Sequence, residues 1–347
     1  MGDVLRAIPA VRLIRTALPD AAIHWIVEPP WHALLEGHRD LDGVVLAPRR
    51  EWASASLRPG VWPAPLGSLR RFGRSIRGLR PDLAVDFHGN LRSGILARWS
   101  GAPVRLGYAG HEQKEGNRLL TTHRIPSGDR RTPRIERNLA LVRALGFADE
   151  PLPACELPLL AAGEDEARAI VHALPGARTD LAVVSPGASL RQAYKRPPAE
   201  LLAAACAHLA RRAIRPLVVW GPGEEPQARA VVEAAGGHAV LAPPTGLASL
   251  AGLLSRSRLF VGGDTGPMHL ACAVGCPVIA VYGPTDPLVN RPWSEHFRVV
   301  VPPGRRYTGI KRIDRRSGGF AGIMDEHLTR ALDELLDATA GVSSRRS

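Results

Sequence analysis

Short apolar segments alternate with helical segments along most of this chain, and this alternation limits the possible folds more than any other feature. We predict strands from apolar runs bounded by turn residues, at 23–27, 43–46, 83–87, 181–184, 216–220, 259–261 and 277–282. The helices predicted around them span 68–79, 90–99, 138–145, 198–212, 225–235, 247–254 and 267–274. Strands that alternate with helices form parallel sheets with right-handed crossovers. The sequence therefore predicts an α/β protein.

A proline-rich stretch divides this alternation into two halves. Pro151, Pro153 and Pro158 lie between the halves, as in a linker, and 347 residues suit two domains with separate cores. We expect an N-terminal domain over residues 1–155, a C-terminal domain over 156–330, and the end of a helix and a disordered tail over 331–347. Both would be parallel-sheet domains facing a cleft, where ligands bind beyond the carboxyl ends of the strands.

The net charge and the aromatic content bear on which classes of partner the protein could bind. The 45 lysine and arginine residues against 33 acidic ones give a net charge of +12, which suits nucleic acid, an anionic membrane surface or an acidic substrate. An excess of arginine and alanine also follows from the base composition of a genome, so the charge alone decides nothing. Aromatic residues are only 5%, and no basic stretch is interleaved with them as a platform for single strands requires. We therefore expect no nucleic-acid partner.

The location of the protein is predicted from the signals that the sequence lacks. No apolar run reaches the ~18–20 residues that span a bilayer, and no basic stretch followed by a long apolar one marks a signal peptide. The four cysteines, Cys155, Cys206, Cys272 and Cys276, show no metal-site spacing and suit buried thiols. We expect a cytoplasmic protein with no metal site and no cofactor.

The most informative motif follows the predicted strand at 259–261. Two glycines end the strand and permit a close approach of backbone to ligand, and Asp264-Thr265-Gly266 then opens a helix. The free N–H groups and the positive dipole end of that helix suit a diphosphate. Asp264 could instead be only an N-cap, worth ~1 kcal/mol. The glycines, His269 one turn later and a second polar turn after the next strand favour ligand binding.

Two other strand ends carry candidate ligand-binding residues. The turn 185–189 leads to Lys195, one of only three lysines in the chain, and a lysine beside the cleft supplies a point charge for a leaving diphosphate. Ser189 in that turn is a further candidate for the same ligand. Glu224 and Glu225 follow the next strand. They suit ribose hydroxyls, as strand-end acids do, or only favour the start of the next helix.

The first half of the chain offers candidates for the catalytic base and the acceptor side. Asp3 precedes an apolar helix, so it either faces the cleft from a helix start or acts only as an N-cap. The stretch 86–90 ends a strand, and its His88 and Asn90 could line the acceptor side. Taken by itself, His88 is more often a structural histidine than a base.

Three motifs occur along the chain. They are Gly-Asp-Val…Pro-Ala near the start, Asp-x-His-Gly-Asn-x-Arg-Ser at 86–93, and Gly-Asp-Thr-Gly-Pro-x-His-Leu…Tyr-Gly-Pro-Thr-Asp-Pro at 263–287. Over nearly the whole chain this pattern resembles glycosyltransferase family 9, the ADP-heptose:lipopolysaccharide heptosyltransferases. The resemblance implies two Rossmann domains of the GT-B type, inversion at the anomeric carbon and no essential metal ligand. The stretch 114–118 resembles the type I enzymes more than type II.

The resemblance also implies roles for individual residues. Asp3 matches the catalytic base of the family. The positions that match its donor site are Lys195, Glu225, Asp264, Thr265, Gly266 and His269. Arg92 and Arg118 would meet the carboxylates and phosphates of an acidic acceptor. The family has a strand before Gly-Asp-Val, whereas this chain begins at Met1, so we expect the first sheet to lack that strand.

The resemblance thus implies an inverting glycosyltransferase that moves a heptose from ADP-heptose to the Kdo/heptose inner core of lipopolysaccharide. Asp3 would take the proton of the acceptor hydroxyl, and Lys195 with the helix start at Thr265 would stabilise the departing diphosphate. The arginine-rich segment 70–80 would hold the protein on the anionic face of the inner membrane, close to a lipid-linked acidic acceptor. The alternatives are a nucleotide-sugar epimerase, a transferase of the same fold with another sugar and acceptor, and a basic nucleic-acid-binding protein, for which no motif is present.

Overall fold

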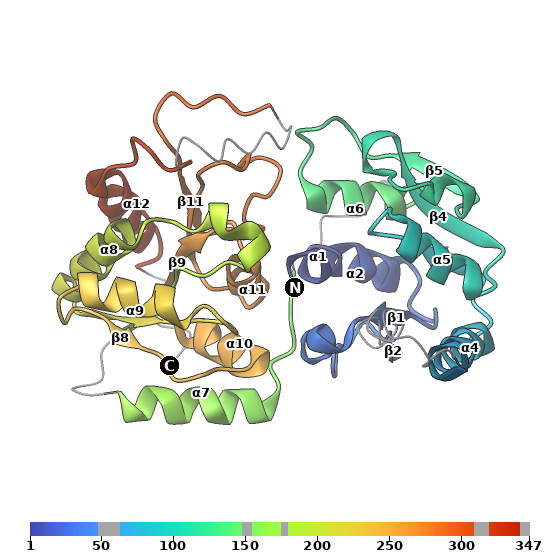
Figure 1. Ribbon diagram of the computed structural model, residues 1–347, viewed down its shortest axis with the longest axis horizontal. Helices are drawn as coiled ribbons and strands as arrows, with labels where there is room; N and C mark the ends of the chain where they lie inside the picture. Colours follow the sequence, from blue (N-terminus) through green and yellow to red (C-terminus); the bar gives the residue numbers. More distant parts are fainter. Residues whose placement is uncertain (48–62, 148–154, 175–179, 309–318, 341–347) are drawn as a thin grey trace. The chain divides into compact units, whose positions relative to one another are not determined.

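The computed structural model describes residues 1–47, 63–147, 155–174, 180–308 and 319–340, and Figure 1 shows their helices and strands. The chain forms two compact units. One contains Arg6–Pro153, and the other contains Met1–Leu5 together with Ala154–Ser347. The beginning of the chain therefore belongs to the same unit as its second half.

The unit formed mainly by the second half is built on a parallel six-stranded sheet with the order β11-β10-β9-β6-β7-β8. Its strands are β6 (Asp180–Ser185), β7 (Ile214–Val218), β8 (Val240–Leu241), β9 (Leu259–Gly263), β10 (Val278–Val281) and β11 (Phe297–Val300). Strands of parallel sheets are covered on both faces by crossover helices, which explains why β9 and β10 are apolar and fully buried. Strands β6 and β9 are neighbours, and Ser185 pairs with Gly262.

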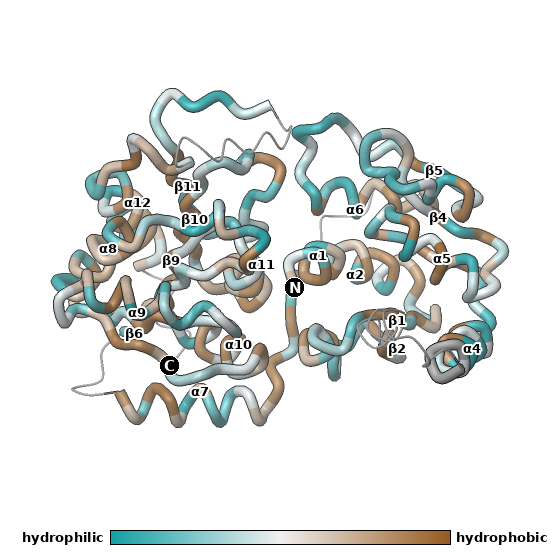
Figure 2. Tube along the Cα trace, in the orientation of Figure 1, coloured by the Kyte–Doolittle hydropathy of each residue, from teal (hydrophilic) through white to brown (hydrophobic). Residues whose placement is uncertain are grey.

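Helices close the core of this unit. They are α7 (Ala161–Ala173), α8 (Ala199–Arg211), α9 (Glu225–Ala234), α10 (Leu247–Arg256), α11 (Gly266–Ala273) and α12 (Asp325–Ala338), with the 3₁₀ helix η4 (Leu190–Lys195) between β6 and α8. Leu202 and Leu209 of α8 and Leu332 and Leu335 of α12 share one buried cluster with the strands. The hydropathy of each segment can be followed in Figure 2. This core fixes the positions of the strand ends and of the residues that follow them.

The other unit contains two parallel sheets, β1–β2 and β3–β4–β5. Its strands are β1 (His24–Val27), β2 (Gly43–Leu46), β3 (Leu83–Val85), β4 (Val104–Ala109) and β5 (His123–Pro126), and its helices are α2 (Ile8–Ala17), α4 (Pro63–Gly78), α5 (Leu91–Trp99) and α6 (Arg134–Arg143). Three 3₁₀ helices lie in its connections, η1 (Pro29–Leu34), η2 (Gly110–Glu112) and η3 (Asn117–Leu119).

The helix α4 of this unit has two different faces. Phe72 and Ile76, one turn apart, are buried against Ala47, as an amphipathic surface helix requires. The arginines of the helix are all exposed, at Arg70, Arg71, Arg74 and Arg77. The arginine-rich segment predicted from the sequence is therefore a cationic helix face.

The predicted α/β class with parallel sheets is confirmed. The strand predicted at 216–220 begins earlier, at Ile214, because Ala213 with a φ of 57° breaks the preceding helix. The sequence did not reveal β4, in which Arg105 and Gly107 interrupt the apolar residues, nor β5, β8, β11, α7 and most of α12. The predicted tail beyond residue 340 and the linker prolines Pro151 and Pro153 lie outside the described residues.

Candidate functional site

The chain segments that leave β6 and β9 approach each other closely. A Cβ added at Gly262 would lie 2.8 Å from the carbonyl oxygen of Ser185, and one added at Gly263 would lie 2.6 Å from the carbonyl oxygen of Lys195. Glycine is required at both positions because no side chain fits between the strand end and the neighbouring backbone. This close approach places Lys195, the last residue of η4, beside the end of β9.

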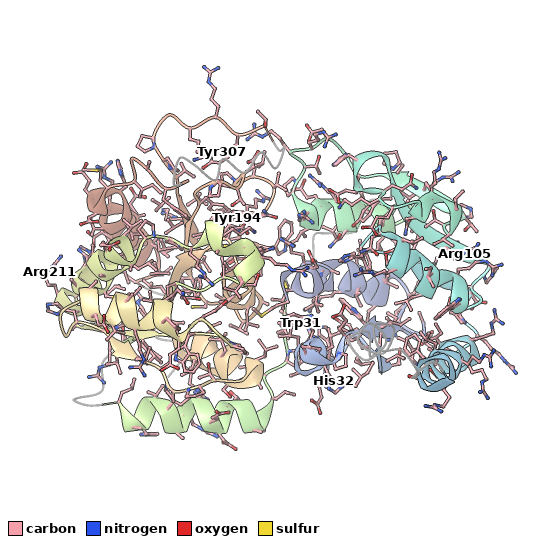
Figure 3. All side chains as sticks on the ribbon, viewed as in Figure 1. Trp31, His32, Arg105, Tyr194, Arg211 and Tyr307 are labelled. Atoms are coloured by element: carbon pink, nitrogen blue, oxygen red, sulfur yellow. The ribbon has the colours of Figure 1, made fainter. Side chains whose placement is uncertain are left out.

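Lys195 and Asp264 form a largely buried ion pair. Lys195 Nζ donates to Asp264 Oδ2 at 2.9 Å and to the Asp264 carbonyl oxygen at 3.1 Å. The side chains of Asp264 and Lys195 are only 2% and 12% exposed. An ammonium has three N–H bonds, so these two contacts leave one for a ligand. Tyr194, labelled in Figure 3, marks this part of η4.

A third residue, Asn290, joins this ion pair and was not predicted from the sequence. Its Nδ2 donates to Asp264 Oδ2 at 3.0 Å, from a position 26 residues further along the chain. Asn290 is 8% exposed. The polar turn after β10 was the signal that pointed to this region, but a single asparagine beyond that turn has no local pattern that distinguishes it.

The N-terminus of α11 follows directly after Asp264. The N-cap residue is Thr265, which has an extended backbone and makes no side-chain hydrogen bond to the first turn. Asp264 is therefore not the cap of this helix, and its carboxylate binds Lys195 and Asn290 instead. Pro267 has no N–H, but the N–H groups of Gly266 and Met268, which no side chain caps, suit an anion. His269, one turn into the helix, is 5% exposed, and its Nε2 lies 3.9 Å from Asp264 Oδ1.

Asp3 lies in the short helix α1 (Gly2–Leu5), which packs against α11. The contact includes Met1 and Gly266, since a Cβ added at Gly266 would clash with the Met1 side chain. Leu5 is buried, whereas Asp3 is exposed. The candidate base and the start of α11 therefore belong to one unit.

The other donor-site candidates differ in their surroundings. Ser189 is exposed immediately before η4. Glu225 begins α9, and its carboxylate accepts from Arg229 of the same helix at 2.5 and 2.9 Å. Glu224 accepts from a backbone N–H of its own turn at 3.1 Å, and it lies against Gly187, where an added Cβ would clash with the carboxylate. Of the two acids, Glu224 is the one that contacts the turn after β6.

In the other unit, Asp86 organises the turn that follows β3. Its Oδ1 accepts from the N–H groups of His88 at 2.9 Å and Gly89 at 3.0 Å. Its Oδ2 accepts from Ser93 Oγ at 2.8 Å and Asn117 Nδ2 at 2.7 Å. Asp86 is 5% exposed, and a buried carboxylate needs such partners. This part of the sequence motif therefore builds the turn.

The four candidate residues for the acceptor side lie around this turn and the neighbouring 3₁₀ helix. Asn90 caps α5, since its Oδ1 accepts from Ser93 N at 3.0 Å. His88, Arg92 and Arg118 are exposed. Helix α5, which carries Arg92, packs against η3, which carries Arg118. Asn90 thus has a structural contact, and the other three side chains are accessible.

A charged cluster that the sequence did not reveal surrounds Glu112. Arg137 is 3% exposed and donates to Glu112 Oε1, Lys114 Nζ lies 3.3 Å from Oε2, and His111 Nε2 lies 3.7 Å from Oε1. Burial raises the pKa of Glu112, but Arg134, Lys114 and Arg137 together hold that pKa below its usual value. Burial, and then the charge of Arg137, lower the pKa of His111. Several cations therefore share one ionised carboxylate.

The cysteines are all buried. Burial raises the pKa of the Cys206 and Cys272 thiols to about 12, and a protonated thiol is a poor nucleophile. Within the described ranges, no group of three or more His, Cys, Asp or Glu side chains could hold a metal ion. No helix in that part of the chain has the length and apolar content needed to cross a membrane.

Known proteins resemble this chain over most of its length. The family model of glycosyltransferase family 9 (heptosyltransferase) matches residues 69–312. Lipopolysaccharide heptosyltransferase 1 of Escherichia coli O18:K1:H7 is 27% identical, and the match covers 89% of this chain and 91% of that protein. Lipopolysaccharide heptosyltransferase 2 of Salmonella typhimurium is 26% identical, with 96% and 94% covered.

Solved structures share the fold. A family 9 glycosyltransferase from Veillonella parvula superposes with a TM-score of 0.78 at 21% identity, and the match covers 97% of this chain and 94% of that one. The Escherichia coli heptosyltransferase WaaC with ADP gives a TM-score of 0.73 at 22% identity, with 96% of each chain covered. The two-unit arrangement of parallel sheets is therefore shared with these glycosyltransferases.

Proposed function

Because this chain belongs to glycosyltransferase family 9, we propose that it transfers a heptose from ADP-heptose to the Kdo/heptose inner core of lipopolysaccharide, with inversion at the anomeric carbon. The names of its relatives support the sugar and the acceptor. The observation that carries the proposal is the ion pair of Lys195 and Asp264 beside the uncapped N-terminus of α11. Both features suit a nucleoside diphosphate, and they lie within one unit.

The donor site stabilises the leaving group. As the bond between the sugar and the diphosphate breaks, negative charge grows on the diphosphate. The remaining N–H of Lys195 and the first N–H groups of α11 donate to those oxygens. Asp264 and His269 orient the sugar or the phosphate, and a buried, hydrogen-bonded carboxylate holds such an orientation without further ordering. Glu224 or Glu225 accepts from the ribose hydroxyls.

The base acts in a single displacement. Asp3 removes the proton of the acceptor hydroxyl while the oxygen attacks the anomeric carbon from the face opposite the diphosphate. This arrangement forms one bond as the other breaks, so the configuration inverts. The exposure of Asp3 and the packing of α1 against α11 support this role, because the carboxylate is accessible and is carried by the unit that holds the donor.

The acceptor is an acidic saccharide attached to a lipid. The exposed Arg92 and Arg118, with His88 near them, suit its carboxylate and phosphate groups. The cations around Glu112 add to this positive character. The exposed arginines of α4 suit the anionic surface in which such a lipid lies.

The donor is tested first with ligands alone. ADP, UDP and GDP are added separately, and the melting temperature is measured; a ligand that binds only the folded protein raises it. We expect ADP to give the largest rise. Equal rises with all three, or none with ADP, contradict the proposed donor.

The reaction is tested next with ADP-heptose and two acceptors, one carrying Kdo alone and one already carrying a heptose. Resemblance to the type I enzymes predicts transfer to the first. Transfer only to the second indicates a type II enzyme. Conversion of the nucleotide sugar without any acceptor indicates an epimerase and overturns the proposal.

A further inference from the structure

Two segments of the motif at 263–287, residues 263–270 and 282–287, are connected through Asn290, which lies outside both segments. Tyr282 follows β10 and is fully buried. Its hydroxyl donates to the carbonyl oxygen of Asn290 at 2.6 Å. Asp286 is also buried, and its Oδ1 accepts from Leu288 N at 3.0 Å, which shapes the turn before Asn290. These contacts fix the backbone at Asn290.

Asn290 uses this fixed position to hold Asp264. Its Nδ2 donates to Asp264 Oδ2 at 3.0 Å, and Lys195 Nζ donates to the same oxygen at 2.9 Å. Two donors on one oxygen fix the plane of the carboxylate. The other oxygen, Oδ1, then lies 3.9 Å from His269 Nε2. The orientation of the whole group therefore depends on a rigid amide as well as on a lysine.

The Asn290 amide and the Lys195 ammonium differ in how firmly they can hold the orientation of the Asp264 carboxylate. A lysine is a point charge on a flexible four-carbon stem, so it follows the carboxylate rather than orienting it. An asparagine amide on an anchored backbone has few ways to move. Without the amide, the Asp264 carboxylate could rotate while Lys195 keeps its second contact, to the Asp264 carbonyl oxygen at 3.1 Å, so the pair would lose its fixed geometry toward the diphosphate. Small displacements of this kind reduce rates because charge stabilisation depends on fixed geometry.

We propose that Asn290 is a positioning residue of the donor site, which orients the Asp264 carboxylate and through it the Lys195 ammonium toward the diphosphate. Its backbone is held in place by the Tyr282 hydroxyl. The inference rests on the proposed nucleotide donor. It also gives Tyr282 and Asp286 a physical role, because they hold the backbone that places the Asn290 amide beside Asp264.

The test measures the Kd for ADP by calorimetry, and kcat and the donor KM by a transfer assay. Asn290→Ala removes the amide, and we expect ADP to bind about tenfold more weakly and kcat to fall by about tenfold or more. Asn290→Asp keeps the size but sets a carboxylate against Asp264, so its loss should be larger. Tyr282→Phe keeps the amide and loosens its backbone, so its loss should be smaller.

A matched control separates positioning from general stability. Ser257 is a buried residue of the same unit, and its hydroxyl donates to the Leu253 carbonyl oxygen at 2.7 Å. Ser257→Ala removes a buried hydrogen bond that does not involve Asp264. We expect it to lower the melting temperature while the Kd for ADP and kcat stay close to wild type. Equal effects of Ser257→Ala and Asn290→Ala on ADP binding would overturn the positioning role.

A double-mutant cycle identifies the route of the effect. If Asn290 acts through Asp264, then Asn290→Ala changes ADP binding by less than about twofold once Asp264→Ala is present. A full, additive loss in that background contradicts the inference. Wild-type protein that binds no ADP overturns the proposed donor and the inference together, whereas wild-type binding with an unaffected Asn290→Ala overturns the inference alone.

Discussion

Lys195 is held twice by Asp264, through a carboxylate oxygen at 2.9 Å and through the carbonyl oxygen at 3.1 Å, across 69 residues of sequence. The close approach at Gly263 makes this possible, since any side chain there would displace the backbone of Lys195. This pair is the central feature of the proposed donor site.

Replacement of Lys195 by alanine should reduce kcat by ~10²-fold or more, the scale of losing one transition-state electrostatic contact. The loss should exceed any change in the donor KM, because the charge on the diphosphate grows as the bond breaks. The control is Arg168→Ala, which removes a surface cation paired with Asp165 on α7. Transfer rates are measured with saturating donor. Activity of Lys195→Ala within about twofold of wild type would show that the lysine does not stabilise the leaving group.

Asp3→Asn should abolish the base while keeping the shape of α1. We expect kcat to fall by ~10²–10⁴-fold, the range for general base catalysis, and the Kd for ADP to stay within about twofold, because the proposed diphosphate contacts come from Lys195 and the start of α11. Both quantities are measured on the same preparation. A large loss of ADP binding with little loss of kcat would assign Asp3 to the packing of α1 on α11 instead.

Glu112 should contribute stability that depends on pH. Its folded pKa lies below the 4.5 of an unconstrained glutamate, so its contribution is fully present above 4.5 and disappears as the pH falls through the folded pKa. Glu112→Gln leaves Arg137 buried beside a neutral amide. We therefore expect the free energy of unfolding to fall by about 3–5 kcal/mol near neutral pH. Urea unfolding of both proteins is compared across the pH range. A difference between them that stays constant on acidification contradicts this account.

Two glycines with similar backbone angles should respond differently to alanine. Gly89 and Gly110 have φ values of 70° and 71°. A Cβ at Gly89 would lie 2.5 Å from the Glu112 carbonyl oxygen, whereas one at Gly110 has nothing within 4 Å. Gly110→Ala should therefore lower the free energy of unfolding only through its left-handed backbone, by about 1–2 kcal/mol. Gly89→Ala should lower it by at least ~1 kcal/mol more, because of the clash. Equal free energies of unfolding for the two variants would show that the turn relaxes.

The cationic face of α4 should bind anionic membranes. Replacing Arg70 and Arg74 by glutamate reverses two exposed charges on α4 and should weaken co-sedimentation with anionic liposomes, at about 1 kcal/mol for each charge near the surface. The binding should also fall as salt is added. The control carries the same change at the exposed Arg211 and Arg168 of the other unit. Equal binding to neutral and anionic liposomes, or equal losses in both variants, would remove the proposed contact.

Much of the candidate donor site could be predicted from the sequence as a cluster of residues, because these residues follow strand ends. The carboxyl ends of parallel strands lie at one edge of a sheet, so motifs after β6 and β9 were expected to meet. Lys195 and Asp264 do meet in this way. The alternative that Asp264 is only a helix cap was settled by the structure, in which Thr265 occupies the cap position.

The sequence by itself determined the α/β class and the residues that follow the strand ends, because the alternation of apolar and turn residues is local and periodic. Only the tertiary structure decided which side chains complete the site. Asn290 reaches Asp264 through a turn that is held by the buried Tyr282. Glu112 pairs with Arg137, which lies 25 residues further along the chain in α6. Such pairings depend on contacts between residues far apart in the chain, and a contact of that kind leaves no periodic pattern in the sequence around either partner.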